Sequence, residues 1–583
     1  GVENDDDDDD DGEDNEADDN AGVAINQFGS AAGVHIFGDG SNIVLGPGTE
    51  GFGFYHRGTL TAAGVFDGVS ATGSSIDGIG GTATVSGGML LDGLLSVSAS
   101  EANAYGLIIG DGGIVPSIEM RNIFTSSVAS ESAQTAYGFF FDTGADVSSF
   151  NNSGSLIVSY FGETGDSYAI QDLSGTLGTI TNSGRIVAQN VATDDDLSDG
   201  IPPPPITGDA IAIDVSANTT GVMLEQVEPV VFTDQDANDN FIAPDTAIIG
   251  DILFGTGADT INLEFGDIIG DISFNAGADV FTIDGAEAVF TGRITDSDGA
   301  LTLNINEGVL NYQGGTLDIT SLTIGNGGEL GVFLSDVPAD TSFIEASGIV
   351  TFLAGSRITP VVPNGLPDFG SQVFLTANGG MFGASNVVGV LAGDNIPFLY
   401  NVAIQVTDAL ALDGDPNSLE ALYQLKTPVE LGLSTNQTVA FDAIIDALRL
   451  DTAAASAMAH ITSEYEFFDA YEDLLPNYGP GATEVAATAI QQMQSATSNR
   501  MAATRMQGFD EVSVWAQEIA YAVNREAPTA NSQEFRGHGF GFAFGIDGPT
   551  DNGAIFGLSA SFITSEVEEP GRPEGGISTW LGQ

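Results

Sequence analysis

Residues 250–261 read GDILFGTGADTI, and residues 270–281 read GDISFNAGADVF. The second segment repeats the first after 20 residues, with apolar residues, glycines and aspartates at matching positions. Self-similarity at a period of about 20–50 residues is typical of solenoids, in which each repeat packs only on its neighbours. The two segments therefore predict a stacked, repetitive fold for this part of the chain.

Longer repeats lie nearer to the N-terminus. Residues 152–158 (NSGSLIV) recur thirty residues later as residues 182–188 (NSGRIVA). Between residues 21 and 404 short apolar segments alternate with turn signals, and almost no helical periodicity is present. We therefore predict a right-handed β-helix over residues 21–404, with coils that turn at Asn-Gly or Gly-Asp. The alternative is an array of β-sandwiches, which does not usually show such short repeats.

Three tyrosines mark the same repeat. Tyr105, Tyr137 and Tyr168 are 32 and 31 residues apart, and each precedes a short segment of small and apolar residues. We expect them to occupy equivalent positions in successive coils.

The composition excludes several classes of function. The 583 residues include 82 Asp and Glu, only 12 Lys and Arg, and no Cys, for a formal charge of −70. Nucleic acid and anionic lipid are excluded as partners, because phosphate binding requires clustered basic residues. The charge implies strong self-repulsion unless salt screens it or cations bind. No apolar run reaches the ~18 residues that a transmembrane helix requires.

The N-terminal segment is the most acidic part of the chain. Residues 1–20 read GVENDDDDDDDGEDNEADDN. A run of like charges does not fold alone, so we expect a solvated, disordered tail; the alternative is an arm that orders when cations neutralise it. The start at Gly1 is expected of a mature chain whose signal peptide has been removed.

Two acidic segments are candidate calcium loops. Residues 234–245 carry side-chain oxygens at the spacing of a cation loop, although Asp239 replaces the central glycine of an EF-hand and no helices flank the segment. Residues 194–206 (DDDLSDGIPPPPI) project as a loop, because four prolines cannot lie in a β-ladder. The predicted Ca²⁺ ligands are Asp234, Asp236, Asn238 and Asp245, then Asp194, Asp196 and Asp199. The alternative for residues 234–245 is a solvated turn.

The glycine and aspartate of the 20-residue repeat have two interpretations. Residues 255–261 (GTGADTI) and 277–281 (GADVF) are similar to the Gly-x-Asp-x-apolar core of calcium β-rolls. Those β-rolls use tandem nonapeptides, whereas these segments are separated by about 20 residues. We therefore interpret them as corners of the coils.

Candidate catalytic residues are few. No G-x-S-x-G segment is present. Gly165-Asp166-Ser167 resembles the nucleophile block of GDSL esterases, which need a downstream His base, but His35 and His56 both lie upstream. Gly165-Asp166 also lines up with Gly208-Asp209, so we interpret it as a turn. Neither histidine has a zinc-ligand partner at the expected spacing. We predict no enzymatic activity.

Helical patterns follow in the transition and linker region, residues 405–481. Ser434 and Thr435 begin a predicted helix of about fifteen residues, and more helix is predicted over residues 452–475. The expected apolar stripe of the first helix consists of Val439, Ile444, Ile445 and Leu448. Residues 482–507 form a long helix without a broad apolar stripe, which suits a water-filled lumen better than a core.

Beyond the long helix the chain alternates large apolar and very small side chains. Residues 540–546 read FGFAFGI. This period of two predicts a strand with rings on one face and glycine or alanine on the other. An outer-membrane β-barrel requires large apolar residues toward lipid, and small residues toward its lumen leave room for an occupant.

Two neighbouring segments show a similar alternation. Residues 556–562 place Phe556, Leu558, Ala560 and Phe562 on one face. Residues 513–523 (SVWAQEIAYAV) place Trp515, Ile519, Tyr521 and Val523 on one face. We expect the rings of all three strands to face lipid; the alternative is a soluble antiparallel sheet with one buried face.

The order of these strands resembles the translocator domain of autotransporters. Residues 514–517 (VWAQ) match the first strand of that domain, Gly541, Gly545 and Asp547 match a G-x-x-x-G-x-D strand, and Gly553, Gly557 and Ser559 match the next strand. The resemblance implies that residues 482–507 thread a barrel of about twelve strands. Some members cleave themselves in this helix at an Asn-Asn pair, where this chain has Ser498-Asn499.

The predicted organisation is an all-β chain with a short helical linker. Residues 1–20 are an acidic tail, 21–404 the β-solenoid passenger, 405–481 the transition and linker, 482–507 the lumen helix, and 508–583 the first strands of a barrel. We expect three strands and a fourth in residues 575–583, and therefore an incomplete outer-membrane β-barrel in this chain.

These features predict a non-enzymatic surface or secreted protein of a Gram-negative bacterium. The barrel would anchor it in the outer membrane, and the passenger would act in adhesion or self-assembly, with Ca²⁺, a glycan or cell-surface ligand, or further copies of the chain as partners. One alternative is a β-helix polysaccharide lyase or hydrolase, argued from fold alone. Another is a subunit of a filament or surface lattice with unpaired strand edges.

Overall fold

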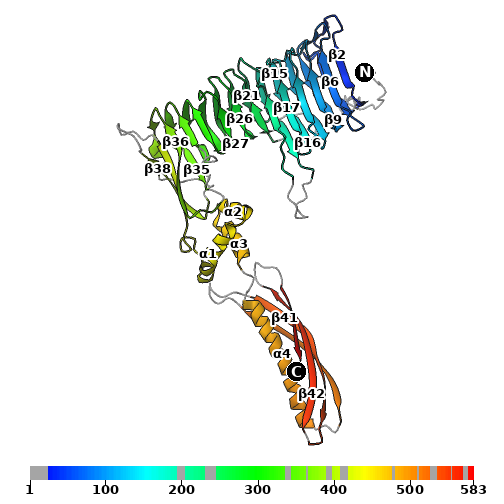
Figure 1. Cartoon of the computed structure of the whole chain (residues 1–583), viewed down its shortest axis with the longest axis vertical. Coiled ribbons are helices and arrows are strands. Elements are labelled where there is room, and N and C mark those ends of the chain that lie inside the picture. The colour runs from blue at the N-terminus through cyan, green and yellow to red at the C-terminus, as the bar shows by residue number, and fades with distance from the viewer. Residues whose placement is uncertain are drawn as a thin grey trace, which may run out of the picture. The chain divides into compact units, whose positions relative to one another are not determined.

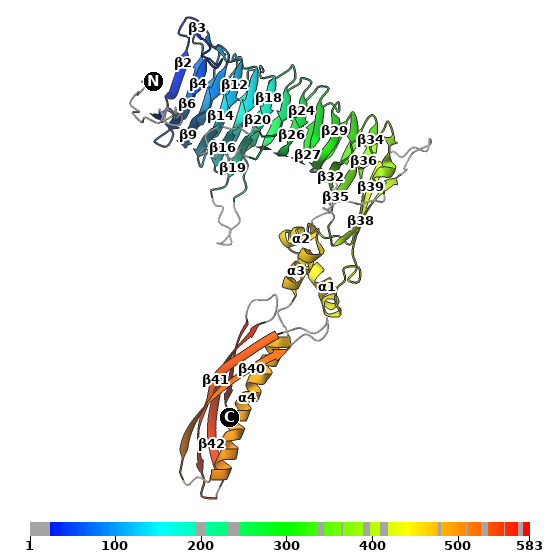
Figure 2. The ribbon, with the colours of Figure 1, turned by 180° about the vertical axis from the view of Figure 1, so that it is seen from behind.

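The computed structural model describes residues 24–193, 204–229, 245–334, 343–362, 365–388, 397–407, 418–475, 480–507, 511–525, 535–552, 554–568 and 575–582. The chain divides into two compact units. The first comprises residues 1–425 and 452–463, and the second comprises residues 426–451 and 464–583. Both are drawn in Figure 1 and, from behind, in Figure 2.

The first unit is a stack of coils built from three ladders of parallel strands. In chain order, ladder 1 contains β1 (Ala24–Phe28), β5 (Thr59–Ala63), β9 (Leu94–Ser100), β13 (Ile123–Ala129), β16 (Ser155–Phe161), β19 (Arg185–Val191), β22 (Ala247–Ile249), β25 (Gly266–Ile269), the later halves of β27 (Val280–Gly292) and β29 (Thr302–Tyr312), β32 (Gly328–Phe333) and β35 (Arg357–Val361).

Ladder 2 contains β2 (Ala32–Phe37), β6 (Ala71–Asp77), β10 (Ala104–Ile109), β14 (Thr135–Phe141), β17 (Asp166–Asp172), β20 (Ala210–Asp214), β23 (Asp251–Leu253), β26 (Ile272–Phe274) and β28 (Ile294–Asp296). A second sheet of β30 (Thr316–Ile319), β33 (Phe343–Ala346) and β36 (Phe369–Ala377) follows it along the chain. A small sheet consists of β3 (Ile43–Leu45), β7 (Ala83–Val85) and β11 (Gly113–Ile114).

Ladder 3 contains β4 (Phe54–His56), β8 (Met89–Leu91), β12 (Ser117–Met120), β15 (Ser149–Asn152), β18 (Thr179–Asn182), β21 (Met223–Gln226), β24 (Thr260–Leu263), the earlier halves of β27 and β29, β31 (Ser321–Ile324), β34 (Val350–Phe352) and β37 (Met381–Phe382). The long strands β27 and β29 join ladders 1 and 3 into one 22-stranded sheet.

The repeats of the sequence coincide with this stacking. Asn152 pairs with Asn182 in ladder 3, and Ile252 pairs with Ile272 in ladder 2. The rings of Tyr105 and Tyr137 stack with centroids 4.8 Å apart, and Tyr168 stacks on Tyr137 at 5.6 Å. The prediction of a mainly β chain with stacked repeats is confirmed, and the large parallel sheets are compatible with a β-helix.

A buried polar column accompanies the apolar interior. The Asn152 amide donates to Asn182 Oδ1 at 2.8 Å, and the Asn182 amide donates to Gln226 Oε1 at 3.1 Å. Gln226 in turn donates to the carbonyl oxygens of Phe265 and Asp267 at 3.0 Å. These three amides are buried and satisfy one another, as buried polar groups must.

Antiparallel pairing replaces the parallel pattern at the C-terminal end of this unit. Strand β36 pairs antiparallel with β39 (Ser418–Leu425), which pairs antiparallel with β38 (Tyr400–Thr407). The 3₁₀ helix η3 (Ala384–Asn386) follows β37, and helix α2 (Thr452–Ala459) belongs to the same unit.

The described part of the second unit contains three helices and an antiparallel sheet. The helices are α1 (Thr435–Leu448), α3 (Glu464–Leu474) and α4 (Pro480–Gln507), and the sheet order is β40 (Ser513–Arg525), β41 (Phe535–Pro549), β42 (Ile555–Glu568) and β43 (Gly575–Gly582). Among the described helices, none has both the length and the apolar character needed to cross a bilayer.

Helix α1 begins as predicted but turns a different side inward. Ser434 caps it in a capping box with Gln437. Ile444, Ile445 and Leu448 are buried, whereas Val439 is 82% exposed. Phe441 is buried instead of Val439. Positions 441, 445 and 448 lie on one side of a helix, and position 439 lies on the opposite side.

The amide column should contribute measurably to stability. Replacement of Asn152 by Leu would leave Asn182 Oδ1 without the Asn152 donor, and we expect it to lower the free energy of unfolding by about 1–3 kcal/mol. Urea denaturation of the full chain, followed by far-UV circular dichroism, measures this change. The matched control is Asn151→Leu on the outward side of the same strand. Equal effects of the two variants would contradict a role for the column.

Candidate functional site

The sheet β40–β43 has two unlike faces, and α4 covers one of them. Ala489, Met493 and Ala496 of α4 are buried in a cluster with Ile519, Ala543 and Ile563 of the sheet. Although α4 lacks a broad apolar stripe, these positions and Val485 recur every three or four residues and form a narrow one. The expectation that this helix would not pack against a core is therefore wrong.

Glycines allow the helix to approach closely. A Cβ atom on Gly537 would lie 2.2 Å from Cγ2 of Val485, so a larger residue in β41 would push α4 away. Val485 itself lies against Phe535 and Val567. The small residues that the sequence places on this face of β41 therefore accommodate the helix.

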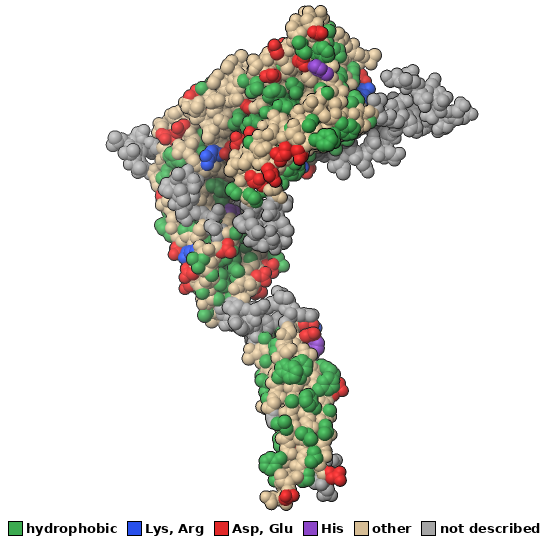
Figure 3. Space-filling model, turned by 45° about the vertical axis from the view of Figure 1, so that its right-hand side comes forward, with side chains coloured by type: hydrophobic (Ala, Val, Ile, Leu, Met, Phe, Trp, Pro, Cys, Tyr) green, Lys and Arg blue, Asp and Glu red, His purple; other side chains and the backbone are tan. Residues whose placement is uncertain are grey.

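The opposite face of the sheet is apolar and open. Phe542 is 49% exposed, and Phe556, Leu558 and Trp580 are each 72% exposed. The other large apolar side chains exposed on this face are Val514, Phe540, Phe544 and Ile546. Figure 3 shows large hydrophobic side chains over the second unit. An exposed apolar patch of this kind marks a surface that contacts protein or membrane.

Strand β40 departs from the expected orientation. Ile519 is buried against α4, and Trp515 and Tyr521 pack on the same cluster. The register explains this, because Trp515 lies opposite Gly545 and Tyr521 opposite Gly539. A Cβ on Gly539 would lie 2.4 Å from the Tyr521 ring, so the ring fills the space that the glycine leaves. The prediction that all three strands turn their rings outward is wrong for β40.

A polar network fixes one end of α4 to the sheet. Arg500 Nε donates to Asp547 Oδ2 at 2.8 Å, and Arg500 Nη2 donates to Asp547 Oδ1 at 2.9 Å and to Ser513 Oγ. The Ser513 hydroxyl donates to Asp547 Oδ1 at 2.7 Å. The two parallel hydrogen bonds between the Arg500 guanidinium and the Asp547 carboxylate fix the orientation of both side chains. The sequence analysis included Asp547 in the G-x-x-x-G-x-D strand but did not single out Arg500. The one indication of Arg500 in the sequence is that it is a basic residue in an otherwise uncharged stretch of the helix.

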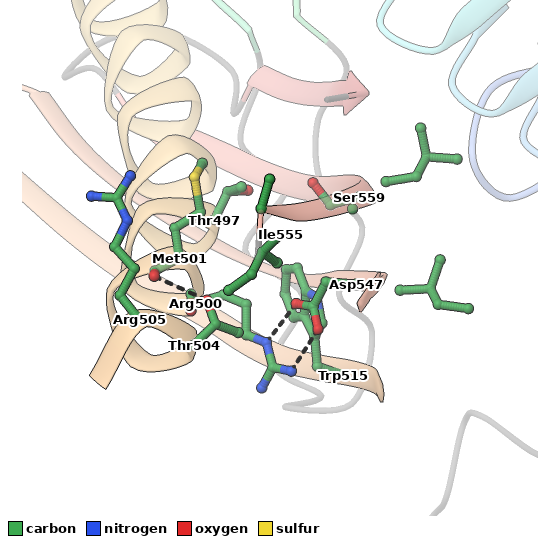
Figure 4. A pocket seen from close by; sticks show the side chains of 13 residues that line it. Thr497, Arg500, Met501, Thr504, Arg505, Trp515, Asp547, Ile555 and Ser559 are labelled. Carbon is green, nitrogen blue, oxygen red and sulfur yellow. Dashed lines mark hydrogen bonds and ion pairs between the residues drawn. The ribbon is translucent and has the colours of Figure 1, made fainter. Parts of the chain in front are cut away.

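Arg500 and Asp547 of this network line a cavity of about 430 Å³ between α4 and the strands (Figure 4). Thr497 and Thr504 line it from the helix, and Trp515 and Ser559 line it from the sheet. The face beneath α4 therefore carries polar groups among apolar ones near Arg500 and is apolar near Met493.

A second notable feature is a pair of buried carboxylates in the coil stack. Asp279 Oδ1 accepts a hydrogen bond from the backbone N–H of Asp259 at 2.7 Å, and Asp259 Oδ1 accepts one from Val222 at 2.7 Å. Both aspartates are 1% exposed, and within the described residues the second oxygen of each has no hydrogen-bond donor. Burial raises the pKa of Asp259 to about 6, with repulsion from Asp279 as a further cause. Each aspartate links two coils at a corner.

The predicted calcium ligands are largely beyond what the structure describes. Asp194, Asp196, Asp199, Asp234, Asp236 and Asn238 lie outside the described residues, and Asp245 is exposed just before β22. Within the described ranges, no three acidic or histidine side chains are grouped so that they could hold a metal ion. The calcium assignment stays a prediction.

The side chains considered for catalysis have structural partners. Ser167 is buried, and its hydroxyl donates to Asn190 Oδ1 at 2.9 Å. Asp166 Oδ1 accepts the backbone N–H of Asp209 at 2.8 Å, which links successive coils. His35 Nε2 lies 2.8 Å from Asp77 Oδ2, and His56 Nε2 lies 3.2 Å from the carbonyl oxygen of Leu94.

Comparisons of this chain with protein-family models, with curated proteins and with solved structures gave no match.

The buried carboxylates make stability depend on pH. Because burial disfavours the charged form, the stabilisation linked to Asp259 is complete below pH 3.8 and is lost as pH rises through about 6. Asp259→Asn, which cannot ionise, should flatten this part of the stability–pH curve. Urea midpoints measured from pH 4 to 8 test this, with exposed Asp284→Asn as the control. An unchanged slope in Asp259→Asn would contradict the assignment.

Calcium should stabilise the chain beyond its effect on ionic strength. A ligand that binds only the folded state at 100 times its Kd adds about 2.7 kcal/mol. We expect millimolar Ca²⁺ to raise the Tm above that in NaCl of equal ionic strength, and Asp234→Asn combined with Asp236→Asn to reduce the difference. The control is Asp39→Asn, an exposed residue that belongs to neither predicted loop. The same Tm in EGTA and in Ca²⁺ would contradict a calcium site.

Proposed function

We propose that this chain is an autotransporter-type surface protein, with a β-solenoid passenger anchored in the outer membrane through its C-terminal strands. The observation that carries the proposal is the sheet β40–β43, which has α4 against its small-residue face and open aromatic side chains on the other. A barrel wall around a lumen helix requires these two faces.

The open face fits a lipid environment better than water. Phe540, Phe542, Phe544 and Ile546 alternate along β41, and Phe556 and Leu558 continue the apolar surface on β42. In water this surface would favour association, whereas in a bilayer it would be solvated by acyl chains. Because β40 and β43 each pair with one described strand only, further strands could extend the sheet at both edges.

The helix-covered face fits a narrow lumen. Val485, Ala489 and Met493 fill the apolar part, and Arg500 forms its ion pair with Asp547 beneath the sheet. An arginine held against a barrel wall needs a carboxylate partner, because an unpaired buried charge is costly. The pairing of Arg500 with Asp547 supports the placement of α4 inside such a barrel.

The coil stack would then be the exported part. Its long parallel ladders offer an extended surface of the kind that solenoids use for binding, and we propose a right-handed β-helix that acts in adhesion or matrix formation at the cell surface. A glycan or cell-surface molecule is the proposed ligand class. The acidic surface, visible in Figure 3 as red side chains that outnumber blue ones, would keep such a rod soluble.

A charged residue on the open face tests the membrane anchor. Phe542→Arg should weaken membrane insertion by about 2–4 kcal/mol if residue 542 lies near the bilayer midplane. The measurement is the fraction of full-length chain that resists urea extraction from isolated outer membranes. The control is Phe66→Arg, an exposed phenylalanine in the coil stack. Urea-resistant Phe542→Arg, or wild-type chain that stays in the cytoplasm, would contradict the proposal.

A further inference from the structure

The tyrosine stack of ladder 2 brings phenol rings of successive coils together. Tyr105 of β10 and Tyr137 of β14 are in register, and their ring planes lie 6° from parallel with centroids 4.8 Å apart. Tyr168 of β17 continues the stack, with its ring 18° from parallel and 5.6 Å from that of Tyr137. Nearly parallel rings at paired positions place equivalent atoms side by side, so the carbons next to the two hydroxyls are neighbours.

These rings lie at the surface of the coil stack. Tyr105, Tyr137 and Tyr168 are half-buried, whereas Tyr160 is completely buried. The Asn103 amide donates to the Tyr105 hydroxyl oxygen at 3.2 Å, so the hydroxyl hydrogen of Tyr105 takes no part in this bond. Burial raises the pKa of Tyr137, which therefore stays a neutral phenol at pH 7. Each of the two phenols thus has a hydrogen atom that an oxidant can remove.

The first unit contains no thiol or indole that could reduce an oxidised tyrosine. The chain has no Cys, and its two Trp, Trp515 and Trp580, both belong to the second unit. Thiols and indoles are the side chains that most readily give an electron to a tyrosyl radical. A radical on Tyr105 or Tyr137 would therefore persist beside a second phenol. Without Cys, the coils also cannot be joined by a disulfide.

We propose that Tyr105 and Tyr137 are a modification site, at which a heme peroxidase with hydrogen peroxide joins adjacent coils through a dityrosine bond. Each phenol loses one hydrogen atom, and the two hydrogen atoms reduce one hydrogen peroxide molecule to two water molecules. The two radicals form a carbon–carbon bond between the positions ortho to the hydroxyls. Each ortho hydrogen then moves as a proton to the oxygen of its own ring, which restores both phenols.

The cross-link would stabilise the coil stack in the way that a disulfide stabilises other proteins. It joins residues 32 positions apart, so it restricts the unfolded chain while it links two coils that are already neighbours. We expect the oxidised chain to have a higher urea midpoint than the untreated chain. The inference goes beyond the proposed membrane anchor and depends on the coil stack alone.

The positions of the arginines allow a direct test. Trypsin cleaves after Arg57, Arg121 and Arg185, so Tyr105 lies in the peptide of residues 58–121 and Tyr137 in the peptide of residues 122–185. The full chain in detergent is treated with a heme peroxidase and hydrogen peroxide, and the monomeric fraction is digested. Mass spectrometry should find these two peptides joined with the loss of two hydrogen atoms, and fragmentation should place the bond between Tyr105 and Tyr137.

Phenylalanine variants separate this pair from the other tyrosines. Tyr105→Phe and Tyr137→Phe keep the ring but have no hydroxyl, so each should abolish the joined peptides and the rise in urea midpoint. The matched controls are Tyr168→Phe, in the same stack, and Tyr160→Phe, in the same tryptic peptide as Tyr137. Both controls should keep the bond between Tyr105 and Tyr137.

Three results would overturn the proposal. Joined peptides that persist in Tyr105→Phe would place the bond elsewhere. Dityrosine found only in species of twice the chain mass would show that it forms between chains. Oxidation of other tyrosines without the joined peptides would show that the stacked rings do not react with each other. None of these results bears on outer-membrane insertion, which is measured separately by urea extraction.

Discussion

One apolar column, kept in register from coil to coil, determines the geometry of the first unit. In ladder 1 it runs through Ile25, Leu60, Leu95, Phe124, Leu156, Ile186, Ile248, Ile268, Phe290, Leu310, Leu330 and Ile358. A slip of one residue would turn every inward side chain of a strand outward, so the register is strongly specified. The number of residues that connect the strands varies widely: Ile186 and Ile248 are neighbours in the column although they lie 62 positions apart in the chain.

This constraint explains why the polar features gather at the corners and ends. In a stack each coil is stabilised by its two neighbours, so a corner can carry an aspartate whose carboxylate accepts a hydrogen bond from an adjacent coil, as Asp166 and Asp279 do. Within the described residues the first coil pairs with one neighbouring coil, and Ile25, its member of the column, is only half-buried.

The sequence predicted the features that depend on local pattern. The spacing of the NSG and GAD segments indicated the stacking, and Ser434 indicated the start of α1. The features it did not predict depend on partners distant in the chain. Trp515 and Tyr521 turn toward α4 because the antiparallel register places them opposite glycines of β41, and no pattern within β40 shows this. Arg500 forms its ion pair with Asp547, which lies 47 residues further along the chain. Phe441 is buried and Val439 is exposed because the neighbours of α1 lie on the side of the helix that carries Phe441. The calcium ligands, the adhesive function and the membrane anchor stay predictions.

The central claim is that β41 has one face toward lipid and one face toward α4. Because the chain contains no cysteine, single Cys residues placed in turn from 540 to 546 can each carry one nitroxide spin label in reconstituted membranes. The account predicts that collision with lipid-soluble oxygen peaks at residues 540, 542, 544 and 546, with low accessibility to both oxygen and a water-soluble nickel chelate at 541 and 543. Accessibility to the nickel chelate at 540, 542, 544 and 546, or no period of two, would contradict it.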